Sequence, residues 1–237
     1  MPTGLVAILV LTAVELETRA LARALSLPPL PSLPFPAFGR GTLRIAPVGI
    51  GAGRLKERWP TLVSPSDSPL VVSAGVCGAL DPRLHVGDLV VCDSVIDGAG
   101  ARRSVTASAS RRAAAARGVN ASTGAMVSSS QVVTTPEAKA ALRAKTGGVA
   151  VDMESAAILE TAARHDCAFM ILRGVSDDAR ETLPVELMAL MNADGRIRAR
   201  KMLGLARPTV FAAALRLRRA SGQALGAVAD SLARLAA

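Results

Sequence analysis

Short apolar runs, each followed by a segment that begins like a helix or a glycine-rich turn, constrain the fold of this chain more than any other feature. The runs lie at 5–11, 43–48, 70–74, 88–96, 149–153 and 169–173. A continuous apolar run is typical of a strand that is buried on both faces of a sheet. Strands that alternate with helices predict an α/β fold, here a three-layer α/β/α sandwich around a twisted mixed sheet.

Two helix starts are marked by their residues. Thr12 with Glu15 three positions on forms a capping-box pattern, which predicts a helix that begins at Thr12. Glu17 would then point about 200° away from Glu15 around that helix, so it cannot share the capping role. Thr135 followed by Pro136 predicts a second helix with proline in its first turn.

Other segments are predicted to be loops and turns that connect these elements. Five prolines between residues 26 and 38 predict a surface loop. Glycines at 49–53 and 75–78 predict turns, and the state of 101–117 is left open. With 237 residues, the chain suits a single domain spanning 1–237, with a helical basic tail from about 184 packed on it.

The charge balance is basic and uneven. Lys and Arg number 28 against 19 acidic residues, and arginines crowd the segment 196–237. Aromatic residues make up only 2% of the chain, so a stacking platform for nucleic acid is not expected. Apolar residues of the tail recur at mostly helical spacing. They are Val210, Phe211, Leu215, Leu217, Leu225, Val228, Leu232 and Leu235. Two interpretations stay open: a helix packed on the domain, or a basic amphipathic end that lies on an anionic membrane.

Cysteine and histidine usage excludes several classes of protein. The three cysteines have no short spacing, which argues against a disulfide framework and a zinc ribbon and favours a cytoplasmic location. No apolar run reaches the roughly 18 residues of a membrane span. Neither His85 nor His165 lies beside a candidate nucleophile, so Ser-His or Cys-His catalysis and a metal site are not expected.

Polar residues that directly follow apolar runs are the candidate site. Glu17 follows the first run, Asp152 and Glu154 bracket a methionine after another, and Arg173 and Asp177 follow the last. Ligands of α/β proteins bind at such strand ends. We expect Asp152 and Glu154 to face opposite ways, with one carboxylate free to bind a diol through two hydroxyl groups.

Four motifs resemble the purine nucleoside phosphorylase and nucleosidase superfamily. They are V-L-T-A-V-E-L-E at 10–17, A-G-V-C-G-A-L at 74–80, V-D-M-E-S-A-A-I at 151–158 and L-R-G-V-S-D at 172–177. The early acidic helix is most similar to methylthioadenosine/adenosylhomocysteine nucleosidases. The tail, at 183–197 and 206–220, resembles hopanoid-associated phosphorylases, which are thought to remove adenine from adenosylhopane.

The resemblance implies roles for the reacting groups. Asp177 would be the general acid at purine N7, oriented by Ser176. Glu154 would hold the ribose hydroxyls, with Met153 beneath the sugar. A nearby carboxylate would also stabilise the oxocarbenium-like ribose that forms as the C–N bond breaks.

The resemblance also implies the remaining binding residues. Glu17 and Arg173 would position the attacking water or phosphate. Val132 and Val133 fall where the family lines its base pocket. The glycine groups would let a ligand approach the backbone, which adds to the predicted substrate-binding residues Gly51, Gly75 and Cys77.

Two departures from the family pattern bear on the substrates. Ser73 stands where the phosphorylases commonly carry a phosphate-holding arginine, which favours water as the nucleophile, with Arg54 as a candidate replacement. Val132 stands where an aromatic residue usually lies against adenine, which favours a bulkier and more apolar nucleoside.

The sequence thus predicts an enzyme that cleaves the N-ribosidic bond of an adenine nucleoside, with adenosylhopane as the preferred substrate. No metal or organic cofactor is expected, with phosphate as an optional co-substrate. The relatives imply a homodimer, and the basic tail suggests peripheral contact with the inner membrane. The alternatives are a methylthioadenosine/adenosylhomocysteine nucleosidase and a non-catalytic basic protein that binds nucleic acid or lipid.

Overall fold

A computed structural model describes residues 6–118, 121–184 and 208–236. Its strands form one mixed sheet. They are β1 (Ile8–Thr12), β2 (Phe38–Arg40), β3 (Leu43–Pro47), β4 (Leu70–Ala79), β5 (Leu89–Val91), β6 (Ser94–Ile96), β7 (Arg102–Ser104), β8 (Ala121–Ser122), β9 (Ala125–Ser128), β10 (Ala150–Asp152) and β11 (Phe169–Asp177). Its helices are α1 (Glu15–Ala24), the short 3₁₀ helix η1 (Ile50–Ala52), α2 (Leu55–Leu62), α3 (Ala109–Ala116), α4 (Pro136–Thr146), α5 (Ser155–Arg164) and α7 (Pro208–Ala236).

The long strand β4 is the branch point of the sheet. Its first half pairs with β1 on one side, and almost its whole length pairs with β11 on the other, both in parallel. Its last residues turn to an antiparallel pairing with β10. Because β4 meets all three strands, the carboxyl ends of β1, β10 and β11 come together around its second half.

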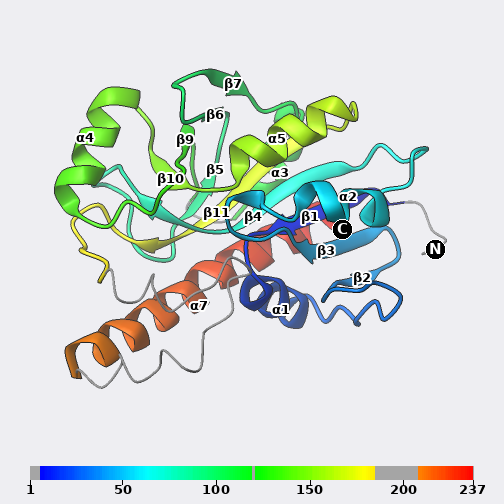
Figure 1. Cartoon of the computed structure of the whole chain (residues 1–237), viewed down its shortest axis with the longest axis horizontal. Helices are drawn as coiled ribbons and strands as arrows, with labels where there is room; N and C mark the ends of the chain where they lie inside the picture. The colour runs from blue at the N-terminus through cyan, green and yellow to red at the C-terminus, as the bar shows by residue number, and fades with distance from the viewer. Residues whose placement is uncertain (1–5, 119–120, 185–207, 237) are drawn as a thin grey trace.

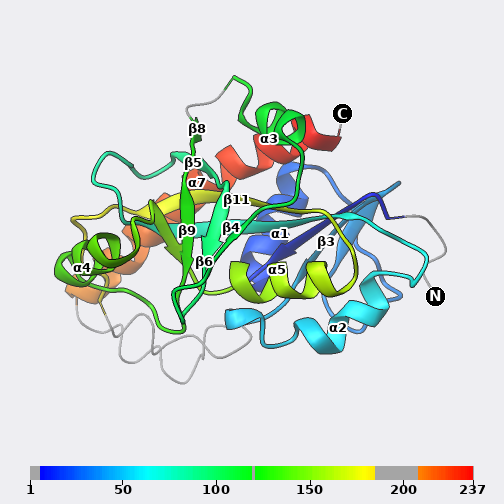
Figure 2. The same cartoon turned by 90° about the horizontal axis from the view of Figure 1, so that it is seen from above.

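Helices cover both faces of the sheet, as Figures 1 and 2 show. Leu9 of β1 belongs to the core beneath α2 and α5, whereas its neighbour Val10 belongs to the core beneath α1, α3 and α7. Adjacent residues of a strand point to opposite faces, so a fully apolar strand supplies both cores. The predicted α/β fold with a mixed sheet covered on both faces is confirmed.

Several local predictions are also confirmed. Thr135 caps α4 by accepting a hydrogen bond from the backbone N–H of Ala138, and Pro136 occupies the first turn. The proline-rich segment between α1 and β2 lacks helix and extended strand, apart from an isolated bridge between Pro29 and Phe38. The segment 101–117, for which the sequence predicted no definite structure, contains β7 and α3.

Three boundaries differ from the sequence predictions. Thr12 is the last residue of β1 rather than a helix cap, and α1 begins at Glu15 after Val14. The glycines at 75–78 lie inside β4 rather than in a turn. The run 88–96 is two strands because the chain changes partner, so that β5 pairs with β11 and β6 with β9.

The tail helix α7 divides into two halves. Leu225, Val228 and Leu232 are buried in the core against the sheet, as the packing interpretation predicts. Phe211 and Leu215 in the first half are 59% and 38% exposed. The basic residues of the tail between 196 and 207 lie outside the described residues.

Candidate active site

The predicted site residues converge at the carboxyl ends of the central strands. Asp152 ends β10 and Asp177 ends β11, while Glu17 projects from the first turn of α1. This is the edge at which open α/β sheets bind ligands. A larger hollow of about 520 Å³ lies at the opposite end of the strands, outside this cluster, and is lined by Val6, Ala7, Ser68, Leu70, Thr106, Ser108, Arg111, Asp166 and Ala168.

Arg173 is the centre of the charged cluster. Its side chain is fully buried in β11, and Nη2 lies 2.8 Å from Asp152 Oδ2 and 3.3 Å from Glu154 Oε2. Nη2 also donates to Ser73 Oγ at 2.9 Å. Burial opposes the charge on the guanidinium, but the neighbouring carboxylates raise the pKa of Arg173 above its ordinary value. Arg173 therefore stays a cation and compensates the surrounding acids.

Glu154 joins α5 to the glycine group at 49–53. It is the N-cap residue of α5, and its Oε1 accepts a hydrogen bond of 3.1 Å from the backbone N–H of Gly51. Burial raises the pKa of Glu154 to about 7, although Arg173 acts to lower it. A carboxyl group with this pKa changes its protonation near neutral pH, which suits contact with sugar hydroxyls and with developing positive charge.

Glu17 bridges α1 and β4. Its Oε2 accepts hydrogen bonds from the backbone N–H groups of Ala13 and Val14, and Oε1 accepts one of 2.9 Å from that of Val76. Burial raises the pKa of Glu17, while Arg173 and these N–H groups act to lower it. The capping prediction was wrong: Glu17 takes the position assigned to Glu15, which instead pairs with Arg19.

At Gly75 and Gly78, β4 has no side chain, and charged side chains approach its backbone there. A Cβ at Gly75 would lie 2.5 Å from Glu17 Oε1 and 2.8 Å from Arg173 Nη1. The φ of Gly75 is 144°, which also favours glycine. A Cβ at Gly78 would lie 2.9 Å from Asp177 Oδ2. These glycines therefore allow close approach, and the strand continues through them.

Asp177 is held at the end of β11 by contacts to both of its oxygens. Ser176 Oγ lies 2.9 Å from Oδ1 and 3.2 Å from the carbonyl oxygen of Cys77. Lys139 Nζ of α4 lies 2.6 Å from Oδ2. The β4–β11 register shifts between Val175 and Asp177, so Asp177 lies opposite Gly78. This shift in register places the end of the strand at the site.

A small cavity of about 70 Å³ lies beside Asp177. Its lining is mainly aliphatic. It includes Val132 and Val133, which were predicted for the base pocket, and Met153, which was predicted beneath the sugar. The other lining residues are Gly78, Gln131, Val151, Asp152, Asp177 and Leu183. Val132 is 41% exposed and stands at the rim. Within the described residues, this lining contains no aromatic side chain.

The structure corrects a further prediction and adds residues that the sequence did not single out. Asp152 and Glu154 do not face opposite ways, because both carboxylates reach Arg173. Positions two apart in an extended chain share a face, a signal that could have found this pair. Lys139 and Leu183 carried no local signal, because their contacts with the site come from distant segments of the chain.

The arrangement separates two kinds of chemistry. In one part of the site, Glu17, Glu154 and Arg173 form a buried cluster of carboxylates around one cation. In the other part, Asp177 borders an aliphatic cavity. The cluster suits hydroxyl binding, water activation and stabilisation of a cationic transition state, and the cavity suits proton donation to a nitrogen of a ring that packs on aliphatic side chains.

A family model described as "Phosphorylase superfamily" matches residues 66–205. This match confirms the family predicted from the sequence and, with it, the prediction of an enzyme. No match was found among curated proteins.

Solved structures of bacterial nucleosidases are similar to this fold. The 5′-methylthioadenosine/S-adenosylhomocysteine nucleosidase of Helicobacter pylori has a TM-score of 0.69 at 17% identity, covering 99% of both chains. The enzyme of that name from Neisseria meningitidis has a TM-score of 0.69 at 21% identity, covering 98% of this chain and 99% of that one. A futalosine hydrolase mutant of Helicobacter pylori has a TM-score of 0.70 at 16% identity, covering 98% of this chain and 99% of that one. At these identities the likeness shows the fold.

Proposed function

Since the chain belongs to the phosphorylase superfamily, we propose that it cleaves the N-ribosidic bond of an adenine nucleoside. One observation carries this proposal: Gly75 adjoins Glu17 and Arg173, and Gly78 on the same strand adjoins Asp177. Three residues of a strand span roughly 10 Å, a spacing that suits the sugar and the base of one nucleoside.

In this mechanism Asp177 donates its proton to N7 of the purine, so that adenine leaves as a neutral molecule. Ser176, which contacts Asp177 Oδ1, orients the acid. Glu154 accepts hydrogen bonds from the ribose hydroxyls and stabilises the positive charge that develops on the sugar. The C1′–N9 bond breaks, and its electrons move to the base as N7 takes the proton.

We propose that water is the nucleophile. Arg173 is fully buried and already faces Asp152 and Glu154, whose carboxylates would repel a phosphate dianion. Arg54 pairs with Glu57 on an exposed stretch at the start of α2. Glu17, whose pKa is raised by burial, would accept the proton of the water as it attacks C1′.

Incubation with methylthioadenosine and with adenosylhopane, each with and without phosphate, tests the reaction and its nucleophile. We expect free adenine from at least the second substrate, at equal rates in both buffers, with the free sugar as the other product. Adenine is measured by chromatography and the sugar by mass spectrometry.

Two results would contradict these expectations. A ribose 1-phosphate product that forms only in phosphate buffer would establish phosphorolysis and direct attention to Arg54 or Arg173. No adenine from either substrate would favour the non-catalytic alternative, a basic protein that binds lipid or nucleic acid.

Adenosylhopane is the proposed substrate because of the aliphatic surroundings of the cavity. Val132 and Leu183 border it, and the resemblance of the tail to hopanoid-associated phosphorylases points the same way. The second candidate is a methylthioadenosine/adenosylhomocysteine nucleosidase. The fold similarity to nucleosidases of that name supports this candidate, and the two substrates are compared in the assay above.

We further propose that the protein is a cytoplasmic homodimer and that each chain is a single domain that needs no metal or organic cofactor. We also propose that α7 contacts the inner membrane. Among the described residues, no helix combines the length and apolarity needed to cross a bilayer. Phe211 and Leu215 are exposed on α7, and the exposed Arg218 and Arg219 follow them in the same helix. Exposed apolar and basic side chains together are typical of helices that lie on anionic lipid.

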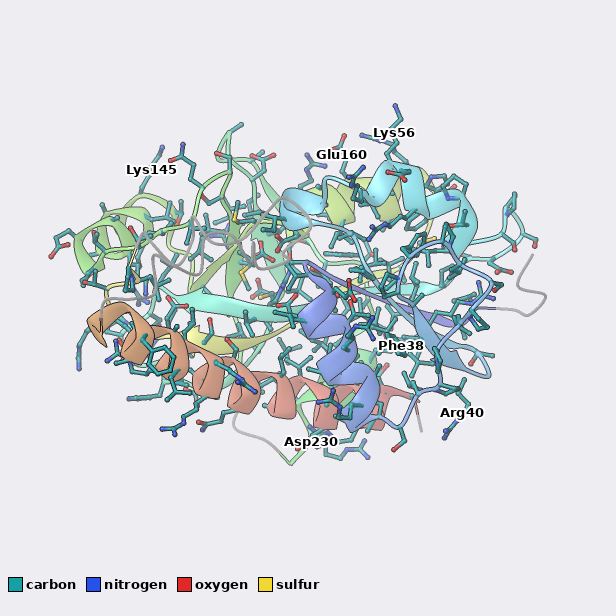
Figure 3. All side chains as sticks on the ribbon, turned by 60° about the horizontal axis from the view of Figure 1, so that its bottom comes forward. Phe38, Arg40, Lys56, Lys145, Glu160 and Asp230 are labelled. Atoms are coloured by element: carbon teal, nitrogen blue, oxygen red, sulfur yellow. The ribbon has the colours of Figure 1, made fainter. Side chains whose placement is uncertain are left out.

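Arg218/Arg219→Ser is expected to weaken binding to anionic vesicles on the order of 30-fold, because each basic residue near such a surface contributes about 1 kcal/mol. The matched control is Lys56/Lys145→Ser, which removes the same charge from side chains that project elsewhere on the surface (Figure 3). Co-sedimentation measures both. Equal losses in the two variants, or equal binding to neutral vesicles, would contradict a docking role for α7.

A further inference from the structure

We propose that Lys139 is a positioning residue for proton transfer, which fixes the carboxyl group of Asp177 and stabilises the negative charge that Asp177 acquires when it gives up its proton. The inference rests on the proposed function, in which Asp177 is the general acid. It assigns to α4 a part in the chemistry that the sequence motifs do not contain.

The burial of Lys139 is the first observation. Lys139 is fully buried, whereas Lys145 of the same helix projects into solvent (Figure 3). A buried ammonium group is costly unless charged or polar partners compensate it. Its Nζ lies 2.6 Å from Asp177 Oδ2, 2.6 Å from the carbonyl oxygen of Asp178 and 3.3 Å from that of Glu181. These three acceptors match the three protons of the ammonium group.

The two oxygens of Asp177 have different partners. Oδ1 is contacted by the neutral hydroxyl of Ser176, and Oδ2 by the cation of Lys139. Both contacts orient the carboxyl group. Only the cation interacts much more strongly with the carboxylate than with the neutral acid, so Lys139 is the partner that favours release of the proton.

The other charged groups near Asp177 are already compensated. Asp152 is paired with Arg173, and the carboxylate of Glu181 lies 3.2 Å from Arg216 Nε of α7. Burial raises the pKa of the Cys77 thiol far above its ordinary range, so this group stays neutral. In the described part of the chain, Lys139 is the ion-pair partner of Asp177.

The consequence for the reaction follows from the charge balance. As the O–H bond of Asp177 breaks and N7–H forms, one negative charge appears on the carboxyl group, 2.6 Å from the ammonium of Lys139. This contact is stronger after proton transfer than before it, so it accelerates the step itself rather than the binding of substrate.

Lys139→Gln tests this inference by removing the charge while keeping a hydrogen-bond donor. We expect kcat for the adenine nucleoside to fall roughly 10- to 100-fold, a part of the 10²–10⁴ typical of general acid catalysis. KM should change little. Lys139→Arg, which keeps the charge, should retain most of the wild-type kcat.

Arg143→Gln is the matched control, because Arg143 lies one turn further along α4 and pairs with Asp81 instead. It should leave kcat unchanged. A nucleoside analogue with a p-nitrophenolate leaving group, which departs without protonation at N7, should be cleaved by Lys139→Gln at nearly the wild-type rate. Lys139→Met is measured in parallel in case the glutamine variant folds poorly.

The outcomes separate this inference from the proposed function. Wild-type protein that releases no adenine would contradict the function of the site. Active wild-type protein together with an unchanged kcat in Lys139→Gln would overturn the role of Lys139. Equal losses on the adenine nucleoside and on the p-nitrophenyl analogue would also overturn it, because they indicate a purely structural effect.

Discussion

Asp177→Asn is expected to reduce adenine release by at least about 100-fold, the lower end of the contribution of general acid catalysis. The asparagine side chain fills the same space beside Ser176 but has no proton to give to N7. Single-turnover measurement of adenine release reports the chemical step directly. Asp230→Asn, the same change at an exposed site on α7 (Figure 3), should keep wild-type activity.

The same substitution leaves the buried ammonium of Lys139 without its carboxylate, so Asp177→Asn should also be less stable. Breaking a buried ion pair by removing one partner is typically costly, whereas removing both is much less so. The double variant Asp177→Asn/Lys139→Met should therefore recover stability in thermal unfolding and stay inactive. Recovery of activity along with stability would contradict the assignment of Asp177 as the acid.

Arg173→Met is expected to have the largest effect on stability, a loss of roughly 3–5 kcal/mol, which is typical when a buried charge loses its partner. The substitution keeps an apolar chain in place of the aliphatic part of arginine but leaves Asp152, Glu154 and Glu17 without their central cation. Urea unfolding followed by circular dichroism measures the loss.

The pH dependence of this variant has a definite sign. Carboxyl groups buried without a cation have folded-state pKa values above their unfolded values, as burial already does for Glu17 and Glu154. The folded variant then binds more protons, so its stability falls as pH rises from about 4.5, the ordinary value for glutamate, through the raised pKa. The deficit should therefore shrink in acid.

A second substitution provides the control. Asp152→Asn in the Arg173→Met background should recover part of the lost stability, because the carboxylate that faces Arg173 at 2.8 Å in the wild type is replaced by an uncharged amide. In the wild-type background the same Asp152→Asn change should destabilise. The same sign in both backgrounds would show that the cluster is not held by its charges.

The sequence predicted those parts of the fold that depend on local chemistry. The apolar runs became strands because each supplies side chains to the cores on both faces of the sheet. The cap at Thr135 and Pro136 depends only on adjacent residues, and it formed as expected. The family motifs pointed to Glu17, Glu154, Arg173 and Asp177 as site residues, and the fold places these four at one edge of the sheet. The family match confirms the superfamily.

The remaining features depend on contacts between distant segments. The start of α1 was misplaced because pairing with β3 extends β1 through Thr12, which a capping pattern does not reveal. Gly75 and Gly78 resemble turn residues in sequence, but they are needed for the close approach of side chains from α1 and β11. Lys139 looks like a surface lysine on a helix until the packing of α4 brings it to Asp177.

The shift in register near the end of β11 makes the site sensitive to the number of residues in this strand. The register shift between Val175 and Asp177 sets Asp177 opposite Gly78. Side chains alternate between faces along a strand, so loss of one residue here would turn the acid towards the opposite layer of helices and leave the composition of the pocket otherwise unaltered. The proline-rich loop between α1 and β2 carries no such constraint on its length. Natural variation in chain length should therefore accumulate in that loop and be absent between Arg173 and Asp177.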